Sequence, residues 1–181
     1  RLLGDGGRVA GVEVSGGTVL PADLVVVGVG LVPNTELARQ AGIQVDNGIL
    51  LNEHLETTAP EVYAAGDVAR FYSPVFDRHL RVEHYDVAVR HGKVAGANMA
   101  GDRVGFMDLP YFFSDMFELR IHVHGTLADH DRVVVRGERH ITDQGGFVQF
   151  YLKEGRIMAY LGVNRKLKEE RAAQKLIASR R

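Results

Sequence analysis

Gly66 and Asp67 are the residues of this chain whose types and spacing best suit ligand binding. Residues 62–65, Val-Tyr-Ala-Ala, are apolar and lie between turn-forming residues, which predicts a short strand covered on both faces. The pair would then lie at the carboxyl end of that strand, where open α/β sheets bind their ligands. Gly66 would let a ligand approach the backbone, and the carboxylate of Asp67 would accept strong hydrogen bonds. A strand that ends in an ordinary turn aspartate stays open as the alternative.

The segment around this pair, residues 57–69, reads Thr-Thr-Ala-Pro-Glu-Val-Tyr-Ala-Ala-Gly-Asp-Val-Ala. It resembles the second flavin-binding motif of the pyridine-nucleotide-dependent FAD oxidoreductases. The resemblance implies that Asp67 hydrogen-bonds a ribityl hydroxyl of FAD and that Gly66 leaves room for the ribityl chain. Residues 22–35 also resemble this family, at the segment where its chain crosses from the NAD domain back to the FAD domain.

Glu83, His84 and Tyr85 form a second candidate group, at the predicted start of a helix. A helix start carries about half a positive charge and several free N–H groups. Residues 82–101 resemble apoptosis-inducing factor and its bacterial relatives, and the related ferredoxin, rubredoxin and dioxygenase reductases usually have Trp where Tyr85 stands. The resemblance implies that Glu83 and His84 lie near the isoalloxazine and nicotinamide rings, and that the helix start stabilises the reduced flavin. A capping glutamate beside a solvated histidine is the alternative.

A third candidate segment, residues 110–115, reads Pro-Tyr-Phe-Phe-Ser-Asp. It resembles the run of aromatic residues that opens the C-terminal domain of the same reductases. The resemblance implies that Phe113 lies close to the flavin. The alternative, that Tyr111 and Phe112 belong to the core of a small β-domain, stays open.

The composition narrows the functional classes. The net charge is −1, so no strong positive field favours nucleic acid as a partner. The absence of cysteine excludes structural disulfides, thiolate metal sites and a redox-active cysteine pair within these 181 residues. No apolar run approaches the roughly 18 residues that a membrane span needs, so we expect a cytoplasmic protein. Because the sequence begins without Met inside a predicted hairpin, we expect it to be part of a longer protein.

Two pairs of histidines raise the question of a metal site. His122 and His124 would share one face of a strand, and His84 and His91 one face of a helix. The sequence shows no carboxylate or third histidine spaced to complete either pair. We therefore expect no metal site.

Local patterns predict the elements of the first 105 residues. In chain order they are a hairpin at 8–20, a covered central strand at 22–28, a helix at 36–41 with Asn34 as N-cap and Gly42 as its end, a hairpin at 43–51, the strand at 62–65, a surface loop at 70–81 and a helix from about 85 that Gly101 closes. Gly92 and Gly96 lie inside this last helix, where glycine is roughly 1 kcal/mol less favourable than alanine. Close packing against a sheet or a ligand would justify that loss.

After residue 105 the pattern is typical of a β-meander with a terminal helix. Strands are predicted at 119–124, 132–136, 146–152 and 157–163, with a turn at Glu154–Gly155. The helix at 166–179 is amphipathic, and we expect an inward face of Leu167, Ala172 or Ala173, Leu176 and Ile177.

The resemblance spans nearly the whole chain and implies its organisation. We expect the last strands of an NAD domain at 1–32, the second segment of an α/β FAD-binding domain at 33–105, and a small α+β reductase domain of antiparallel sheet plus helix at 106–181. The implied cofactor-binding residues are Gly66, Asp67, Glu83, His84, Tyr85 and Phe113.

The implied function is that of a flavoprotein oxidoreductase, which moves electrons from NAD(P)H through FAD to a ferredoxin-like protein, a quinone or oxygen. No side chain need act as a nucleophile or a general base, because the cofactors carry the redox chemistry. A non-catalytic module for homodimerisation or partner docking is the alternative.

Overall fold

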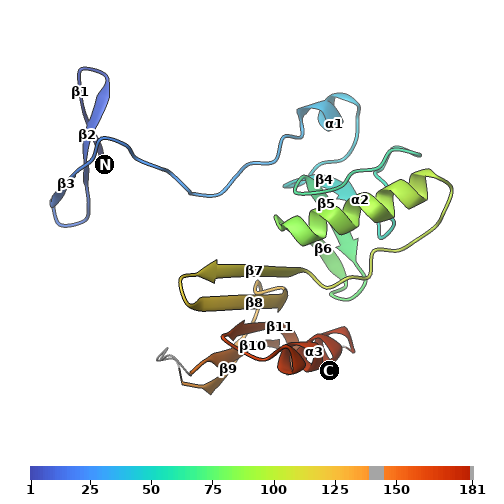
Figure 1. Ribbon diagram of the computed structural model, residues 1–181. Helices are drawn as coiled ribbons and strands as arrows, with labels where there is room; N and C mark the ends of the chain where they lie inside the picture. The colour runs from blue at the N-terminus through green and yellow to red at the C-terminus, as the bar shows by residue number, and fades with distance from the viewer. Residues whose placement is uncertain (139–144, 180–181) are drawn as a thin grey trace. The chain divides into compact units, whose positions relative to one another are not determined.

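The computed structural model describes residues 1–138 and 145–179 of the chain. These residues fold into two separately packed units, Arg1–Val32 and Pro33–Arg181 (Figure 1). Within the described residues, no helix has both the length and the apolar character that crossing a membrane requires.

The first unit contains a three-stranded antiparallel sheet. Its strands are β1 (Leu2–Asp5), β2 (Arg8–Glu13) and β3 (Val19–Pro21), in the order β1-β2-β3. The hairpin predicted at 8–20 is confirmed by the pairing of β2 with β3. Strand β1, which lies before the hairpin predicted at 8–20, adds to the other side of β2.

The covered central strand predicted at 22–28 is not formed. These residues belong to no strand, and Val26 is 87% exposed. A strand requires a neighbour to take up its N–H and C=O groups. No described strand pairs with this segment, so its β-branched residues remain unpaired and in contact with solvent.

The second unit begins with helix α1 (Glu36–Gln40) and strand β4 (Ile49–Leu51). Thr35, rather than the predicted Asn34, is the N-cap of α1, while Gly42 adopts φ 72° just after the helix, as expected. The hairpin predicted at 43–51 does not form two regular strands: an isolated antiparallel bridge joins Val45 to Ile49, and the amide of Leu50 donates to the carbonyl of Gln44 at 3.0 Å. All three residues of β4 pair in parallel with a later strand, Ile49 with Ala69 and Leu51 with Phe71 at the two ends.

The strand predicted at residues 62–65 is not formed either. Tyr63 makes one isolated bridge to Glu56, and the amide of Ala64 donates to the carbonyl of Leu55 at 3.2 Å. The left-handed backbone of Glu61, φ 64°, interrupts the extended run just before it. Gly66 and Asp67 therefore precede a strand, β5 (Ala69–Ser73), rather than ending one.

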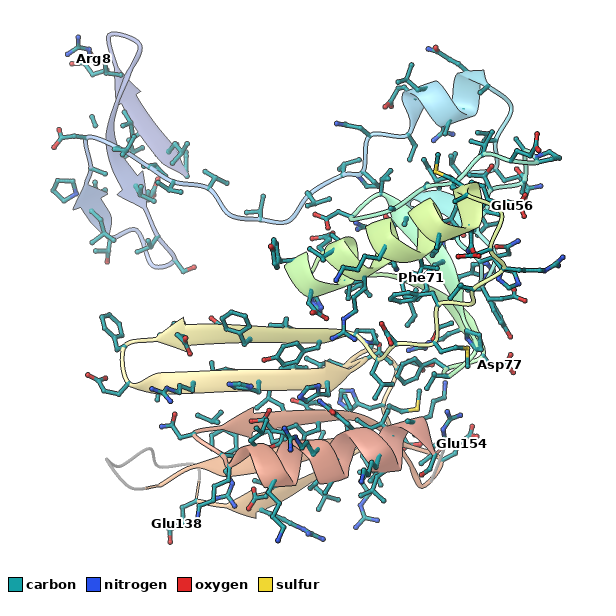
Figure 2. The ribbon with its side chains drawn as sticks, turned by 45° about the vertical axis from the view of Figure 1, so that its right-hand side comes forward. Arg8, Glu56, Phe71, Asp77, Glu138 and Glu154 are labelled. Carbon is teal, nitrogen blue, oxygen red and sulfur yellow. The ribbon has the colours of Figure 1, made fainter. Side chains whose placement is uncertain are left out.

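The surface loop predicted at 70–81 is also wrong. β5 and β6 (Arg78–Arg81) form an antiparallel hairpin in a sheet with the order β4-β5-β6. Alternate residues of β5, including Ala69 and Phe71, are completely buried, and charged and polar residues between them obscured this pattern. Figure 2 labels Phe71 within this region.

The predicted second helix is confirmed as α2 (Tyr85–Met99), and Gly101 follows it with φ 105°. Val87 and Ala95 face the sheet and join a core that also contains Leu51, Leu55, Ala69, Phe71 and Phe106. The close packing expected at Gly92 and Gly96 is not made by the described residues, because a Cβ at either position would meet no atom within 4 Å.

A five-stranded antiparallel sheet and helix α3 (Leu167–Ala178) complete the chain. The strands are β7 (Tyr111–Met116), β8 (Leu119–Gly125), β9 (Arg132–Gly137), β10 (Phe147–Lys153) and β11 (Arg156–Val163). The four predicted strands are confirmed, but the order β7-β8-β11-β10-β9 is not a simple meander. β11 adds to β8, so β9 lies at the far edge of the sheet.

The inward face of α3 differs in part from the prediction. Ala173 and Ile177 are buried as expected, whereas Leu167 and Leu176 are exposed. Glu170 takes the third buried position because it lies on the same face as Ala173 and Ile177, at helical spacings of three and seven residues. The domain boundary proposed at residue 105 stays a prediction.

Candidate functional site

The start of α2 is the centre of the candidate site. His84 is its N-cap, in an extended conformation, and its side chain makes no capping hydrogen bond. The first intrahelical bond of this turn runs from the amide of Ala88 to the carbonyl of His84, at 2.9 Å. The amides before Ala88 have no partner within the helix, so the helix start can donate to a ligand and favours negative charge.

Gly66 lies beside this first turn. It adopts φ 81°, a conformation that glycine takes without strain, and its carbonyl accepts from the amide of Ala69 at 2.9 Å. A Cβ placed on Gly66 would lie 3.9 Å from the Cβ of Ala88. The turn at 66–69 therefore brings the backbone against α2, and a side chain at Gly66 would be strained.

Arg81 connects the two candidate groups, although it was not predicted from the sequence. Its Nη1 atom lies 2.7 Å from Oε1 of Glu83 and donates to the carbonyl of Asp67 at 3.3 Å. The side chain is mostly buried at the end of β6, two residues before Glu83. That spacing, on one face of an extended segment, is the signal that could have identified it.

Burial favours the neutral form of His84 at pH 7. Burial lowers the pKa of His84 below its ordinary value of 6.5, while the carboxylates of Asp67, Glu83 and Asp86 oppose the shift. Nδ1 of His84 is buried and has no hydrogen-bond partner in the part of the chain that the structure describes. The side chain of Asp67 is exposed, so its carboxylate can accept from a ligand hydroxyl.

His84 also contacts the C-terminal sheet. Its ring centroid lies 4.6 Å from that of Phe112, with an angle of 49° between the ring planes. A cavity of about 310 Å³ lies beside this contact. It is lined by Arg81, Val82, Glu83, His84, Pro110, Phe112, Val123, Gly125, Thr126 and Leu127. Phe112, for which the sequence left a core role open, thus joins the site through a contact between distant segments.

Tyr85 and Phe113 both present exposed aromatic rings. Tyr85 is 86% exposed at the first position of α2, and Phe113 is 60% exposed on β7. Phe113 stacks on Tyr111, with ring centroids 6.3 Å apart. Both exposed rings offer apolar surface on which a planar ligand can stack.

The histidines that raised the metal question have different surroundings. His91 is completely buried within the core, whereas His84 lies at the start of the helix beside the cavity. His122 and His124 face a carboxylate that the sequence did not reveal, because Oε2 of Glu170 on α3 lies 3.2 Å from Nδ1 of His122 and 3.6 Å from Nε2 of His124. In residues 1–138 and 145–179, no group of three or more acidic or histidine side chains is arranged to hold a metal ion.

The site thus combines an exposed carboxylate, a helix start with free amides, a glycine turn and two exposed aromatic rings. Residues 1–92 match the family of pyridine nucleotide-disulphide oxidoreductases, and residues 111–181 match the family of reductase C-terminal domains. The chain belongs to the pyridine nucleotide-disulphide oxidoreductase family. The superfamily and the branch indicated by the sequence resemblance are confirmed.

The curated relatives of this family member include reductases of electron-transfer systems. Putidaredoxin reductase of Pseudomonas putida is 40% identical over 167 residues, which cover 92% of this chain and 39% of the relative. The ferredoxin–NAD(+) reductase component of the anthranilate 1,2-dioxygenase system of Burkholderia cepacia is 37% identical over 180 residues, covering 99% and 43%. The chain therefore spans about two fifths of the length of these relatives.

Solved structures agree with the fold. The crystal structure of the covalent putidaredoxin reductase–putidaredoxin complex matches with a TM-score of 0.85 and 40% identity, over 95% of this chain and 40% of that one. The fold class expected from the sequence, part of an α/β FAD-binding domain followed by a small α+β reductase domain, is confirmed. The detailed strand assignments within it are corrected as described above.

Proposed function

We propose that this chain forms the second FAD segment and the C-terminal domain of an oxidoreductase that moves electrons from NAD(P)H through FAD to a ferredoxin-like protein. The observation that carries the proposal is the bridge made by Arg81. It contacts both the carbonyl of Asp67 and the carboxylate of Glu83, and so holds the glycine turn against the start of α2. Family membership and the reductases among the relatives support the same activity.

The residues present fit an FAD. Asp67 would accept from a ribityl hydroxyl, and Gly66 would allow the close approach of the chain that carries it. The free amides at the start of α2 suit the electron-rich edge of a flavin ring. The flavin would supply the redox chemistry, while the protein binds and orients the ring and excludes water.

Neutral His84 and the exposed rings of Tyr85 and Phe113 have roles that follow from their positions. The imidazole of His84 would lie beside the flavin without adding positive charge. Tyr85 and Phe113 would lose solvent contact when the flavin ring or the protein acceptor covers them. All six residues, Gly66, Asp67, Glu83, His84, Tyr85 and Phe113, remain proposed cofactor-binding residues.

A ferredoxin-like acceptor is the partner that the similar proteins favour. One similar solved structure is a covalent complex of putidaredoxin reductase with putidaredoxin, in which a reductase is joined to another protein. We further propose a cytoplasmic location. Homodimerisation stays a prediction that gel filtration at several protein concentrations can test.

The flavin content of the complete protein tests the proposal. Residues 1–181 contain no Gly-x-Gly-x-x-Gly phosphate-binding loop, so we expect the isolated chain to be colourless. We expect the complete protein to be yellow and to oxidise NAD(P)H. A complete protein without flavin absorption after purification and after incubation with FAD would contradict the proposed function.

Asp67→Ala in the complete protein tests the site itself. A hydrogen bond to a charged group contributes about 1.5–3 kcal/mol, so the Kd for FAD should rise about ten- to a hundredfold. Asp102→Ala is the matched control, because Asp102 is also an exposed aspartate but follows the far end of α2. Equal FAD affinity in the two variants would refute the role of Asp67.

A further inference from the structure

Arg78, the first residue of β6, binds the loop that follows β8. Its Nη1 atom lies 3.0 Å from Oδ2 of Asp129. Its Nη2 atom donates to Oγ1 of Thr126 at 3.3 Å and to the carbonyl of Ala128 at 3.4 Å. A planar guanidinium that reaches three acceptors at once fixes direction as well as distance.

This attachment joins the strand that leads into one wall of the 310 Å³ cavity to Thr126, a residue of the opposite wall. One wall follows directly from β6 and contains Glu83 and His84, and the other contains Phe112 on β7 and Thr126 after β8. The walls meet at the ring contact between His84 and Phe112. They are also joined where Arg78 reaches Thr126. The two walls are therefore joined by a ring contact at His84 and by a hydrogen bond at Thr126.

The turn before Arg78 is itself anchored. Val75 and Phe76 are buried against residues of β10, β11 and α3, in a second hydrophobic core. Nη2 of Arg156 donates to the carbonyl of Val75 at 2.5 Å. Figure 2 labels Asp77 on this turn and Glu154 on the β10–β11 turn, and both residues line one shared cavity. Arg78 therefore starts from a fixed point, and its bonds can hold β6 in place.

We propose that Arg78 is a positioning residue, which holds the cavity walls at the spacing that brings His84 against Phe112 beside the bound flavin. This inference rests on the proposed function. Loss of the guanidinium would let the two walls shift relative to each other. Misplacement by about 1 Å at a reacting centre can lower a rate about a hundredfold, so a small shift here is measurable.

Lys153 on β10 provides a matched control. Its ammonium group also binds Oδ2 of Asp129, so Lys153→Met removes a salt bridge from the same carboxylate. Arg78 and Lys153 both lie outside the lining of the cavity beside His84, but Arg78 bonds to Thr126, which lines it, whereas Lys153 binds Asp129, which does not. Arg78→Met and Lys153→Met thus remove comparable surface ion pairs, but only the first releases a cavity wall.

The experiment compares Arg78→Met, Arg78→Lys and Lys153→Met in the complete flavin-containing protein. The readouts are the visible absorption spectrum of the flavin, and kcat and KM for NADH with ferricyanide as the acceptor. We expect Arg78→Met to lower kcat about ten- to a hundredfold and to shift the flavin band. Arg78→Lys should recover part of kcat, and Lys153→Met should stay within about twofold of the wild type.

Thr126→Val gives a second test that keeps the ion pair with Asp129. It removes one acceptor of Arg78, and we expect a smaller fall in kcat in the same direction. Equal kcat for Arg78→Met and Lys153→Met, with unchanged flavin spectra, would overturn the positioning role. A complete protein that holds no flavin would instead overturn the proposed function, so the two failures are distinguishable.

Discussion

The first turn and the middle of α2 use the same residue type for opposite purposes. At the first turn, half-buried His84 is surrounded by three carboxylates and lies beside a cavity. Two turns further along, His91 is completely buried between Phe71 and Phe106, with ring centroids 4.6 and 4.4 Å away. The polar start of the helix is thus accessible to a ligand, whereas its middle is buried in the core.

The position of a histidine along α2 therefore decides whether it affects ligand binding or the stability of the fold. Burial lowers the pKa of His91 to about 4, although the carboxylate of Asp108 opposes the shift. Neither ring nitrogen of His91 has a hydrogen-bond partner among the described residues. A histidine in the middle of α2 therefore costs stability, whereas His84 at its start is available for a ligand.

The largest expected effect is on the sealed core. Phe71→Ala removes a completely buried ring, and core substitutions of this kind lower the free energy of unfolding by about 3–5 kcal/mol. Urea denaturation followed by circular dichroism measures the loss. Phe113→Ala is the control, since that ring is mostly exposed and should change stability by far less. If both variants lost a similar amount of unfolding free energy, the distinction between a buried core ring and an exposed site ring would be wrong.

The pH dependence of stability sharpens the contrast at His91. The unfolded chain binds a proton on this histidine below about pH 6.5, whereas the folded chain does so only below about pH 4. The free energy of unfolding should therefore fall as the pH drops from 6.5 to 4, with His91 contributing about 3 kcal/mol of that fall. Urea denaturation at several pH values measures this dependence.

His91→Leu isolates that contribution. Because leucine carries no buried polar atoms without partners, we expect the variant to be more stable by about 1–3 kcal/mol at pH 7. The variant should also lose the part of the pH dependence that His91 causes. If its stability fell between pH 6.5 and 4 as steeply as that of the wild type, the role of His91 would be excluded.

The smallest expected effect on stability is at the first turn. Tyr85→Ala removes an exposed ring, so the free energy of unfolding should change by no more than about 0.5 kcal/mol. In the complete protein, the same change should increase flavin fluorescence, because a nearby tyrosine ring would no longer stack on the flavin. Unchanged flavin fluorescence together with a lower free energy of unfolding would show that Tyr85 stabilises the fold and does not contact the flavin.

Local sequence patterns predicted the C-terminal sheet better than the preceding segment. β8 begins at Leu119 as expected, and Glu154 and Gly155 adopt the positive φ values that their turn requires. These strands find antiparallel neighbours within the described chain, so local alternation was a sufficient guide. The apolar run at 22–28 joins no described strand, and the run at 62–65 makes only an isolated bridge from Tyr63 to Glu56. A strand depends on its partner as much as on its own residues.

Residues adjacent in the chain were enough to place a glycine and a carboxylate together at 66–67 and to predict the helix that begins after His84, although the strand expected before Gly66 is not formed. Only the tertiary structure decided which side chains complete the site. Arg81 reaches back to Asp67, and Phe112 packs on His84 from another sheet. Such contacts join segments far apart in the chain, so they follow from packing and burial and from no local pattern.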